Sequence, residues 1–128
     1  MTVHNGKKAT FSPEWTVNAS YEHRFDLGSI GTLIPEIDMQ YKSEYFLAFE
    51  TVERPGRELW VPPWIVQEPH YLLNGSVTFN HSSDIWSIRA YVKNATDYAA
   101  KNFWGGFWDI YLGLSDPRTF GAVVSVKF

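Results

Sequence analysis

Apolar and polar residues alternate at period two in this sequence, and this is the feature that most restricts its fold. Because successive side chains of a strand point to opposite faces, such alternation predicts strands with one apolar and one polar side. The pattern covers residues 15–25, 32–42, 71–80, 86–93 and 120–128. No stretch keeps a helical period for long, although residues 97–104 could form a helical turn. The sequence therefore predicts an all-β fold, an antiparallel meander of about five strands.

The connections between these segments alternate in length. Short ones rich in turn residues follow Phe25 and Asn80, and long ones follow Tyr45 and Asn94. Residues 47–69 and 99–114 contain Pro-Gly, Pro-Pro and Gly-Gly pairs, which predict irregular structure. Transmembrane barrels have short periplasmic turns and longer extracellular loops. We therefore expect a partial transmembrane β-barrel wall with two long loops, flawed or bulged at Pro35, which has no amide hydrogen.

The aromatic content favours a membrane over a soluble core. Phe, Trp and Tyr make up 17% of the chain. When the strands are threaded as above, four aromatic residues fall at one level and form a predicted aromatic girdle. They are Phe25, Phe79, Trp86 and Phe128. Alternation alone favours a soluble sheet, since soluble β-proteins are common, but the girdle and the loop lengths reverse that preference.

The composition argues against several functional classes. The net charge is -3 without clustered Lys or Arg, so we expect no nucleic-acid partner. The chain has no cysteine, and its four histidines lack metal-ligand spacing, so neither a metal nor another cofactor is predicted. No nucleotide-binding loop or nucleophile motif occurs, and we expect no enzyme. The polar N-terminus lacks a signal-peptide core, and no apolar run is long enough for a membrane helix.

The C-terminal third carries recognisable motifs. WSIRAYVKNATD at residues 86–97, DPRTFG at 116–121 and a last strand ending in Phe128 resemble the C-terminus of TonB-dependent outer-membrane receptors. PEWT at residues 13–16 and the pattern Tyr-x-Ser-x-Tyr at 41–45 are similar to the same family. The resemblance covers the chain from about Pro13, with Ala95 standing where the family usually has a larger aliphatic residue.

The resemblance implies a function and a location. Such receptors import scarce nutrients (ferric siderophores, haem, cobalamin or carbohydrates) across the bacterial outer membrane, using a plug domain and the inner-membrane TonB system. Residues 1–128 would be one partial domain, the last strands of the barrel, with residues 1–13 a remnant of an extracellular loop. We expect a truncated product or fragment that does not transport alone. Its partners would be membrane lipid, the rest of the barrel and plug, TonB through the missing plug, and the barrel-assembly machinery.

Several residues are candidates for a functional role. Phe128, preceded by Val126 and Val124, is the assembly signal that the resemblance implies; otherwise its ring simply packs at the membrane boundary. Arg118 could contact an acidic ligand, but pairing with a neighbouring carboxylate is the stronger expectation. Glu36 and Asp38 share a strand face, and paired carboxylates can act as general acid and base or bind a metal. A hydrated lumen wall is the stronger interpretation, with Arg89 and Lys93 of a nearby strand balancing their charge.

The two long loops also hold a group of candidates for ligand contact. These are the tryptophans Trp60, Trp64, Trp104 and Trp108. Packing between the loops is the stronger expectation for them, and ligand contact is the alternative. Two rival functions remain. One is a soluble β-sheet module that binds a small ligand on its aromatic face, and the other is an enzyme, for which no catalytic constellation is found.

Overall fold

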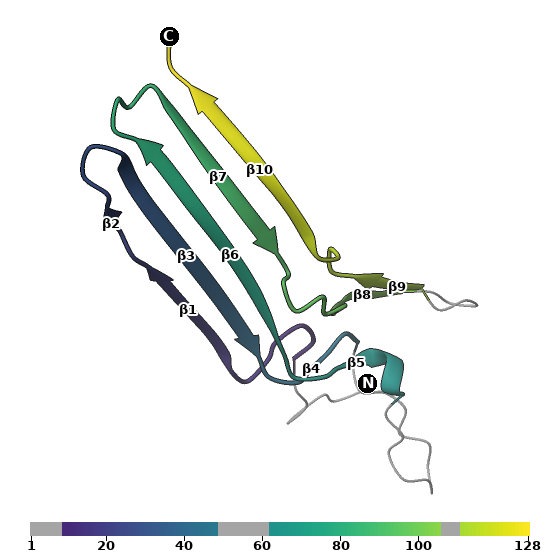
Figure 1. Ribbon diagram of the computed structural model, residues 1–128. Coiled ribbons are helices and arrows are strands. Elements are labelled where there is room, and N and C mark those ends of the chain that lie inside the picture. The colour runs from purple at the N-terminus through teal and green to yellow at the C-terminus, as the bar shows by residue number, and fades with distance from the viewer. Residues whose placement is uncertain (1–8, 49–61, 106–110) are drawn as a thin grey trace, which may run out of the picture. The chain divides into compact units, whose positions relative to one another are not determined.

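The computed structural model describes residues 9–48, 62–105 and 111–128. Regular structure in these ranges is almost entirely strand (Figure 1). The strands are β1 (Thr16–Glu22), β2 (Phe25–Asp26), β3 (Gly31–Lys42), β4 (Tyr45–Phe46), β5 (Val66–Gln67), β6 (His70–His81), β7 (Trp86–Lys93), β8 (Lys101–Gly105), β9 (Tyr111–Leu114) and β10 (Thr119–Val126). One 3-10 turn, η1 (Pro63–Ile65), precedes β5. No helix in the described ranges has the length and apolarity needed to cross a membrane.

The main sheet confirms the predicted all-β antiparallel meander. Its strands lie in the order β1-β3-β6-β7-β10, which is also their order in the chain, and β2 continues β1 beside β3. Figure 1 shows neighbouring strands running in opposite directions. The sheet does not close on itself, so β1 and β10 form its two outer edges.

The strand register places like residues opposite each other. Between β6 and β7 the apolar pairs are Gly75↔Val92, Val77↔Ala90 and Phe79↔Ile88. Between β7 and β10 they are Val92↔Phe120, Ala90↔Ala122, Ile88↔Val124 and Trp86↔Val126. Because side chains directly opposite in antiparallel strands share a face, the alternation within each strand adds up to one apolar and one polar face of the sheet.

The flaw expected at Pro35 lies in the neighbouring strand. β3 runs unbroken through Pro35, whereas β1 ends at Glu22 and β2 begins at Phe25. The amide of His23 donates to the carbonyl of Pro35 at 3.1 Å. Proline has no amide hydrogen with which to return the bond, so the ladder is interrupted on the β1 side rather than by a bulge in β3.

Glycine is required where the first short turn meets β6. Gly31 has φ +141, and a Cβ added there would lie 2.0 Å from the carbonyl oxygen of Asn80. Ser82 N donates to Ile30 O at 3.1 Å directly beside this contact. The absence of a side chain at Gly31 thus lets two turn regions approach closely.

The long connections are more regular than the sequence predicts. Contacts divide the chain into two units, and residues 17–40, 71–98 and 116–128 form the unit that contains most of the main sheet. In the other unit β4 pairs with β5 and β8 pairs with β9, so the expectation of irregular structure is wrong at β5, β8 and β9. The helical turn considered for residues 97–104 is also wrong, because β8 begins at Lys101. Residues 49–61 and 106–110 lie outside the described ranges.

Candidate functional site

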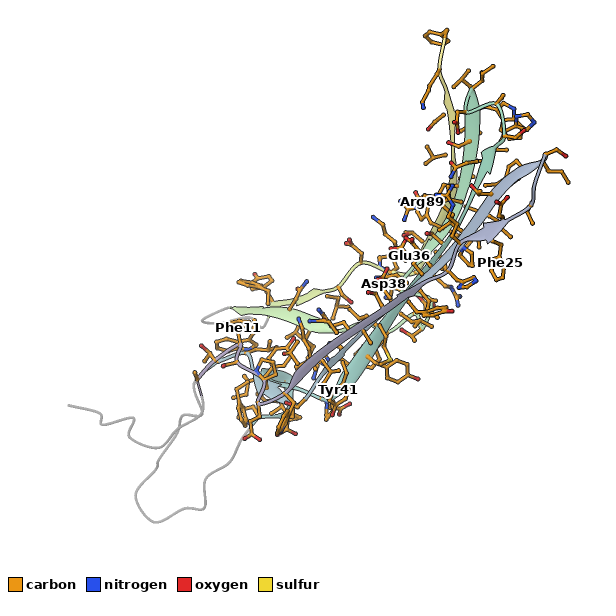
Figure 2. All side chains as sticks on the ribbon, turned by 90° about the vertical axis from the view of Figure 1, so that its left-hand side faces the viewer. Phe11, Phe25, Glu36, Asp38, Tyr41 and Arg89 are labelled. Carbon is orange, nitrogen blue, oxygen red and sulfur yellow. The ribbon has the colours of Figure 1, made fainter. Side chains whose placement is uncertain are left out.

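In the middle of the main sheet, on β3 and β6, the apolar face is more exposed than the polar face, whereas the edge strands β1 and β10 are exposed on both faces. Val77 on the apolar face of β6 is 43% exposed, whereas the preceding Ser76 on the polar face is 8% exposed. Figure 2 shows Glu36, Asp38 and Arg89 on one side of the sheet and Phe25 on the other. A soluble antiparallel sheet has the opposite arrangement, with apolar side chains packed on a core and polar ones in water.

The exposed apolar positions extend over every strand of the sheet. They include Val17, Tyr21, Phe25, Ile37, Met39, Tyr71, Val77, Ile88, Phe120, Val124 and Val126. The buried apolar side chains of the described residues belong to the other unit: Tyr45, Phe46, Leu47, Ile65 and Ala100. A continuous apolar surface of this kind marks contact with a membrane, a partner or a ligand.

The four residues of the predicted girdle lie near the end of the sheet that carries the short turns and the C-terminus (Figure 1). The rings of Phe79 and Trp86 are 5.5 Å apart, and Trp86 also stacks on His81 at 4.9 Å. Phe25 pairs across strands with Leu33. Phe128 follows β10 and is fully exposed.

Two aromatic residues at the other end of the same face were missed by the sequence reasoning. Tyr71 is 56% exposed and Phe120 is 80% exposed. Each precedes a girdle residue, Phe79 or Phe128, by 8 positions. At about 3.3 Å per residue this spacing corresponds to roughly 26 Å along a strand. A strand tilted by about 40° would then cover about 20 Å of depth, close to the apolar band of about 25 Å in outer-membrane barrels.

The three positions of the expected assembly signal lie on or beside an open edge. Val124 and Val126 belong to β10, which pairs with β7 on one side and has no neighbour in the sheet on the other. Both valines are more than half exposed. The outer edge of β10 therefore offers backbone groups that a further strand can use.

On the polar face, one cluster links β3, β6 and β7. The Ser76 hydroxyl donates to Glu36 Oε2 at 3.1 Å. Arg89 Nη2 donates to the Ser76 hydroxyl at 3.2 Å and forms an ion pair with Glu36 Oε2 at 3.4 Å. The expectation that Arg89 balances the acidic residues of the wall is confirmed for Glu36.

The cluster borders an open groove of about 620 Å³ on the main sheet. It is lined by Asp38, Asn74, Gly75, Ser76, Arg89, Tyr91, Val92, Lys93 and Val123. Most of these are polar-face residues of β3, β6 and β7, the strands that the cluster holds together.

A second polar cluster fixes the end of β7 to the start of β10. Asn94 is 8% exposed, and its side-chain amide donates to the carbonyls of Tyr98 at 3.0 Å and Asp116 at 2.9 Å. Its Oδ1 accepts from Thr96 Oγ1 and from Tyr98 N. Asp97 accepts from the Arg118 amide at 3.1 Å and pairs with its guanidinium at 3.6 Å. The expectation that Arg118 pairs with a nearby carboxylate is confirmed, and the motifs at 86–97 and 116–121 meet here.

The loop aromatics are only partly described. Trp64 lies in η1 and Trp104 in β8, within the same unit, and both are half-buried; Trp60 and Trp108 lie outside the described ranges. Trp104 Nε1 is buried without a hydrogen-bond partner. The two connections are joined at Lys101, whose amide donates to Gln67 Oε1 at 2.5 Å and whose Nζ donates to Val66 O at 2.8 Å. Loop-to-loop contact of this kind was expected, though for the tryptophans and not for these residues.

In the described part of the chain no three His, Asp or Glu side chains gather as a metal site would require. Comparisons with protein-family models, with curated proteins and with solved structures found no match.

Proposed function

We propose that this chain is a wall segment of an outer-membrane β-barrel of the TonB-dependent receptor type, without catalytic chemistry of its own. The observation that carries the proposal is the inverted exposure in the middle of the main sheet, where Val77 is 43% exposed beside Ser76 at 8%. A barrel wall needs this arrangement, because its apolar face meets lipid and its polar face meets a hydrated interior. The nutrient imported by the assembled receptor would be a ferric siderophore, haem, cobalamin or a carbohydrate.

The open edges support a larger barrel. Membrane-spanning strands need all backbone groups paired, so an open sheet cannot span a bilayer on its own. Bacterial single-chain barrels have an even number of antiparallel strands, at least about 8. The main sheet has five strand positions, so closure requires an odd number of further strands, at least about three.

Copies of this sheet do not supply those strands. β1 and β10 point in the same direction in Figure 1. A head-to-tail ring of identical copies would therefore place β10 of one copy beside β1 of the next in parallel, which breaks the antiparallel order. A pair of copies related by a two-fold axis would keep all neighbours antiparallel, but it would put the long connections of one copy on the side of the short turns of the other, unlike the barrels of outer membranes. We assign the missing strands to the rest of a receptor barrel, whose plug would contact the TonB system.

The same edge explains the proposed role of the C-terminus. Assembly machinery can recognise a strand by adding it to its own sheet edge, with alternate side chains filling pockets. Val124, Val126 and Phe128 alternate on the apolar side at the open edge of β10, as this mode of recognition needs.

Spin labelling tests the lipid-facing assignment. The chain has no cysteine, so single cysteines can be introduced at Val124 on the apolar face and Ser125 on the polar face. The labelled chain is taken up in detergent micelles, which can cover the apolar face without requiring the open sheet to span a bilayer. Relaxation by oxygen, which concentrates in the apolar micelle interior, is compared with relaxation by a water-soluble nickel complex. We expect oxygen to dominate at position 124 and nickel at position 125. A third label at Ser83, in the exposed turn, reports full access to nickel.

The same experiment identifies the rival function. A soluble ligand-binding module would remain in the aqueous phase as a monomer, with the label at position 124 buried from both relaxants or open to nickel. Either result would contradict the membrane assignment.

A further inference from the structure

The ring of Tyr91 forms the floor of the groove on the main sheet. Tyr91 of β7 lies over Gly121, its partner on β10, because a glycine leaves room for the ring. The ammonium of Lys93 is 6.0 Å from the centre of the same ring, within cation–π range. The groove above this floor has a volume of about 620 Å³, which is in the range of small-molecule sites.

Two of the charged side chains around the groove form an ion pair with each other, and two others do not. Glu36 and Arg89 neutralise each other through their ion pair. Asp38 and Lys93 also line the groove, and neither forms an ion pair with any residue in the described ranges. One carboxylate on β3 and one ammonium group on β7 therefore have no ion-pair partner among the described residues.

Asn74 of β6 lies on the strand between the two charges. The Oδ1 atom of Asn74 accepts a hydrogen bond from the backbone N–H of Asn94 at 3.0 Å, and this bond orients the side-chain amide of Asn74. The Nδ2 group then remains to donate to a ligand carbonyl. Two strand spacings of about 4.8 Å separate β3 from β7, so the backbones that carry the two charges are at least about 10 Å apart.

We propose that this groove binds a short zwitterionic peptide. The amino group lies at Asp38, the carboxylate at Lys93, and a peptide carbonyl accepts from Asn74 Nδ2. At about 3.5 Å per residue, an extended tripeptide spans roughly 10 Å, which matches the strand separation. A neutral ligand would leave Asp38 without an ion-pair partner and Lys93 with only the face of the Tyr91 ring, and a simple cation or anion would pair with only one of the two charges. This proposal does not depend on the barrel function, although the groove lies on the face assigned to the lumen.

Triglycine is the probe for the test, with N-acetyl-triglycine and triglycine amide as versions that lack one charge. Binding is measured on the full chain in detergent micelles by the NMR shifts of the Asn74 side-chain amide. We expect saturable binding of triglycine, and about fivefold weaker binding of each blocked peptide, the upper range for a solvent-exposed ion pair.

Two variants should each lower the affinity only for peptides that carry the charge with which the replaced side chain pairs. Asp38→Asn should weaken triglycine about fivefold but leave N-acetyl-triglycine unchanged, because that peptide has no amino charge to lose. Lys93→Gln should weaken triglycine by a similar factor and leave triglycine amide unchanged. Glu22→Gln and Lys127→Gln, which change exposed charges outside the groove lining, should alter no affinity.

Three results would overturn the proposal: no saturable binding of triglycine, equal binding of the blocked peptides, or equal effects of groove and control variants. Because spin labelling reports lipid contact and this titration reports peptide contact, a failure of one is distinguishable from a failure of the other.

Discussion

Tyr91 on β7 covers Gly121 on β10, and the two residues fit only because position 121 has no side chain. A Cβ at Gly121 would lie 2.7 Å from the Tyr91 hydroxyl oxygen and 2.9 Å from its Cζ atom. A glycine within a strand leaves the backbone uncovered, and a cross-strand aromatic ring can cover it.

Gly121→Ala should therefore displace the Tyr91 ring and destabilise the sheet by on the order of 1 kcal/mol, since a side chain can rotate away more easily than backbone. Gly75→Ala is the matched control, because its Cβ would meet its nearest neighbours at an ordinary 3.7 Å. Restricting the unfolded chain should make that variant neutral or more stable by about 0.4–1 kcal/mol. Denaturant unfolding in micelles measures both, and a cycle with Tyr91→Ala should show coupling between 91 and 121; additive effects would contradict the contact.

Gly31→Ala should be far more damaging than Gly28→Ala. A Cβ at Gly31 would meet the Asn80 carbonyl, which is backbone and cannot rotate away, so we expect a loss of at least about 3 kcal/mol. At Gly28 (φ +63) nothing lies within 4 Å, and only the left-handed conformation is penalised, by about 1 kcal/mol. The two variants are compared by unfolding free energy, and equal costs would show that the approach of Gly31 to β6 is unimportant.

Asn94→Asp should destabilise the chain by about 2 kcal/mol, although it keeps the shape of the side chain. The substitution removes the two donations to Tyr98 O and Asp116 O and turns a carboxylate oxygen toward these carbonyls. Amide hydrogen exchange of Arg118 should accelerate, because the start of β10 loses its attachment. Asn80→Asp, at a half-buried position of β6, should cost less than about 0.5 kcal/mol; a similar cost at both sites would refute the role of Asn94.

Val124→Arg should destabilise the chain in detergent micelles by up to roughly 2–4 kcal/mol, the cost of a charge on the lipid face of a barrel strand. Ser125→Arg places the same charge on the polar face and should cost less than about 1 kcal/mol. Unfolding by denaturant in the micelles, followed by tryptophan fluorescence, compares the two. If both arginines are tolerated equally, Val124 does not face hydrocarbon.

Deletion of Phe128 should weaken the binding of the chain to purified barrel-assembly machinery by at least about tenfold, or about 1.4 kcal/mol. Phe120→Ala removes an exposed aromatic residue from β10, the strand that Phe128 follows, and should change this affinity by less than about threefold. Surface-based binding assays in detergent provide the measurement. Equal effects would mean that the terminal ring acts only through general apolarity.

Local alternation was enough to predict the long strands of the main sheet and their faces. β6, β7 and β10 begin and end within one or two residues of the predicted segments, because each has a regular period of two. The hairpin of β8 and β9 was missed, since its strands are short and no alternation distinguishes them from a loop. The pairing of Arg118 with a carboxylate was predictable from charge, but its partner Asp97 depends on how β7 and β10 are joined.

Other features depend on how neighbouring strands are paired, which the sequence of a single segment does not reveal. The groove exists because Tyr91 meets Gly121 and because β6 lies between Asp38 and Lys93. The aromatic pair Tyr71 and Phe120 could have been found from the sequence, because each lies 8 residues before a residue already assigned to the girdle.

The shared direction of β1 and β10 limits how a gene for such a sheet can change. Tandem duplication of the whole unit would create a seam of two parallel strands, whereas gain or loss of a hairpin such as β6 with β7 keeps every neighbour antiparallel. Variation in strand number among relatives should therefore occur in steps of two.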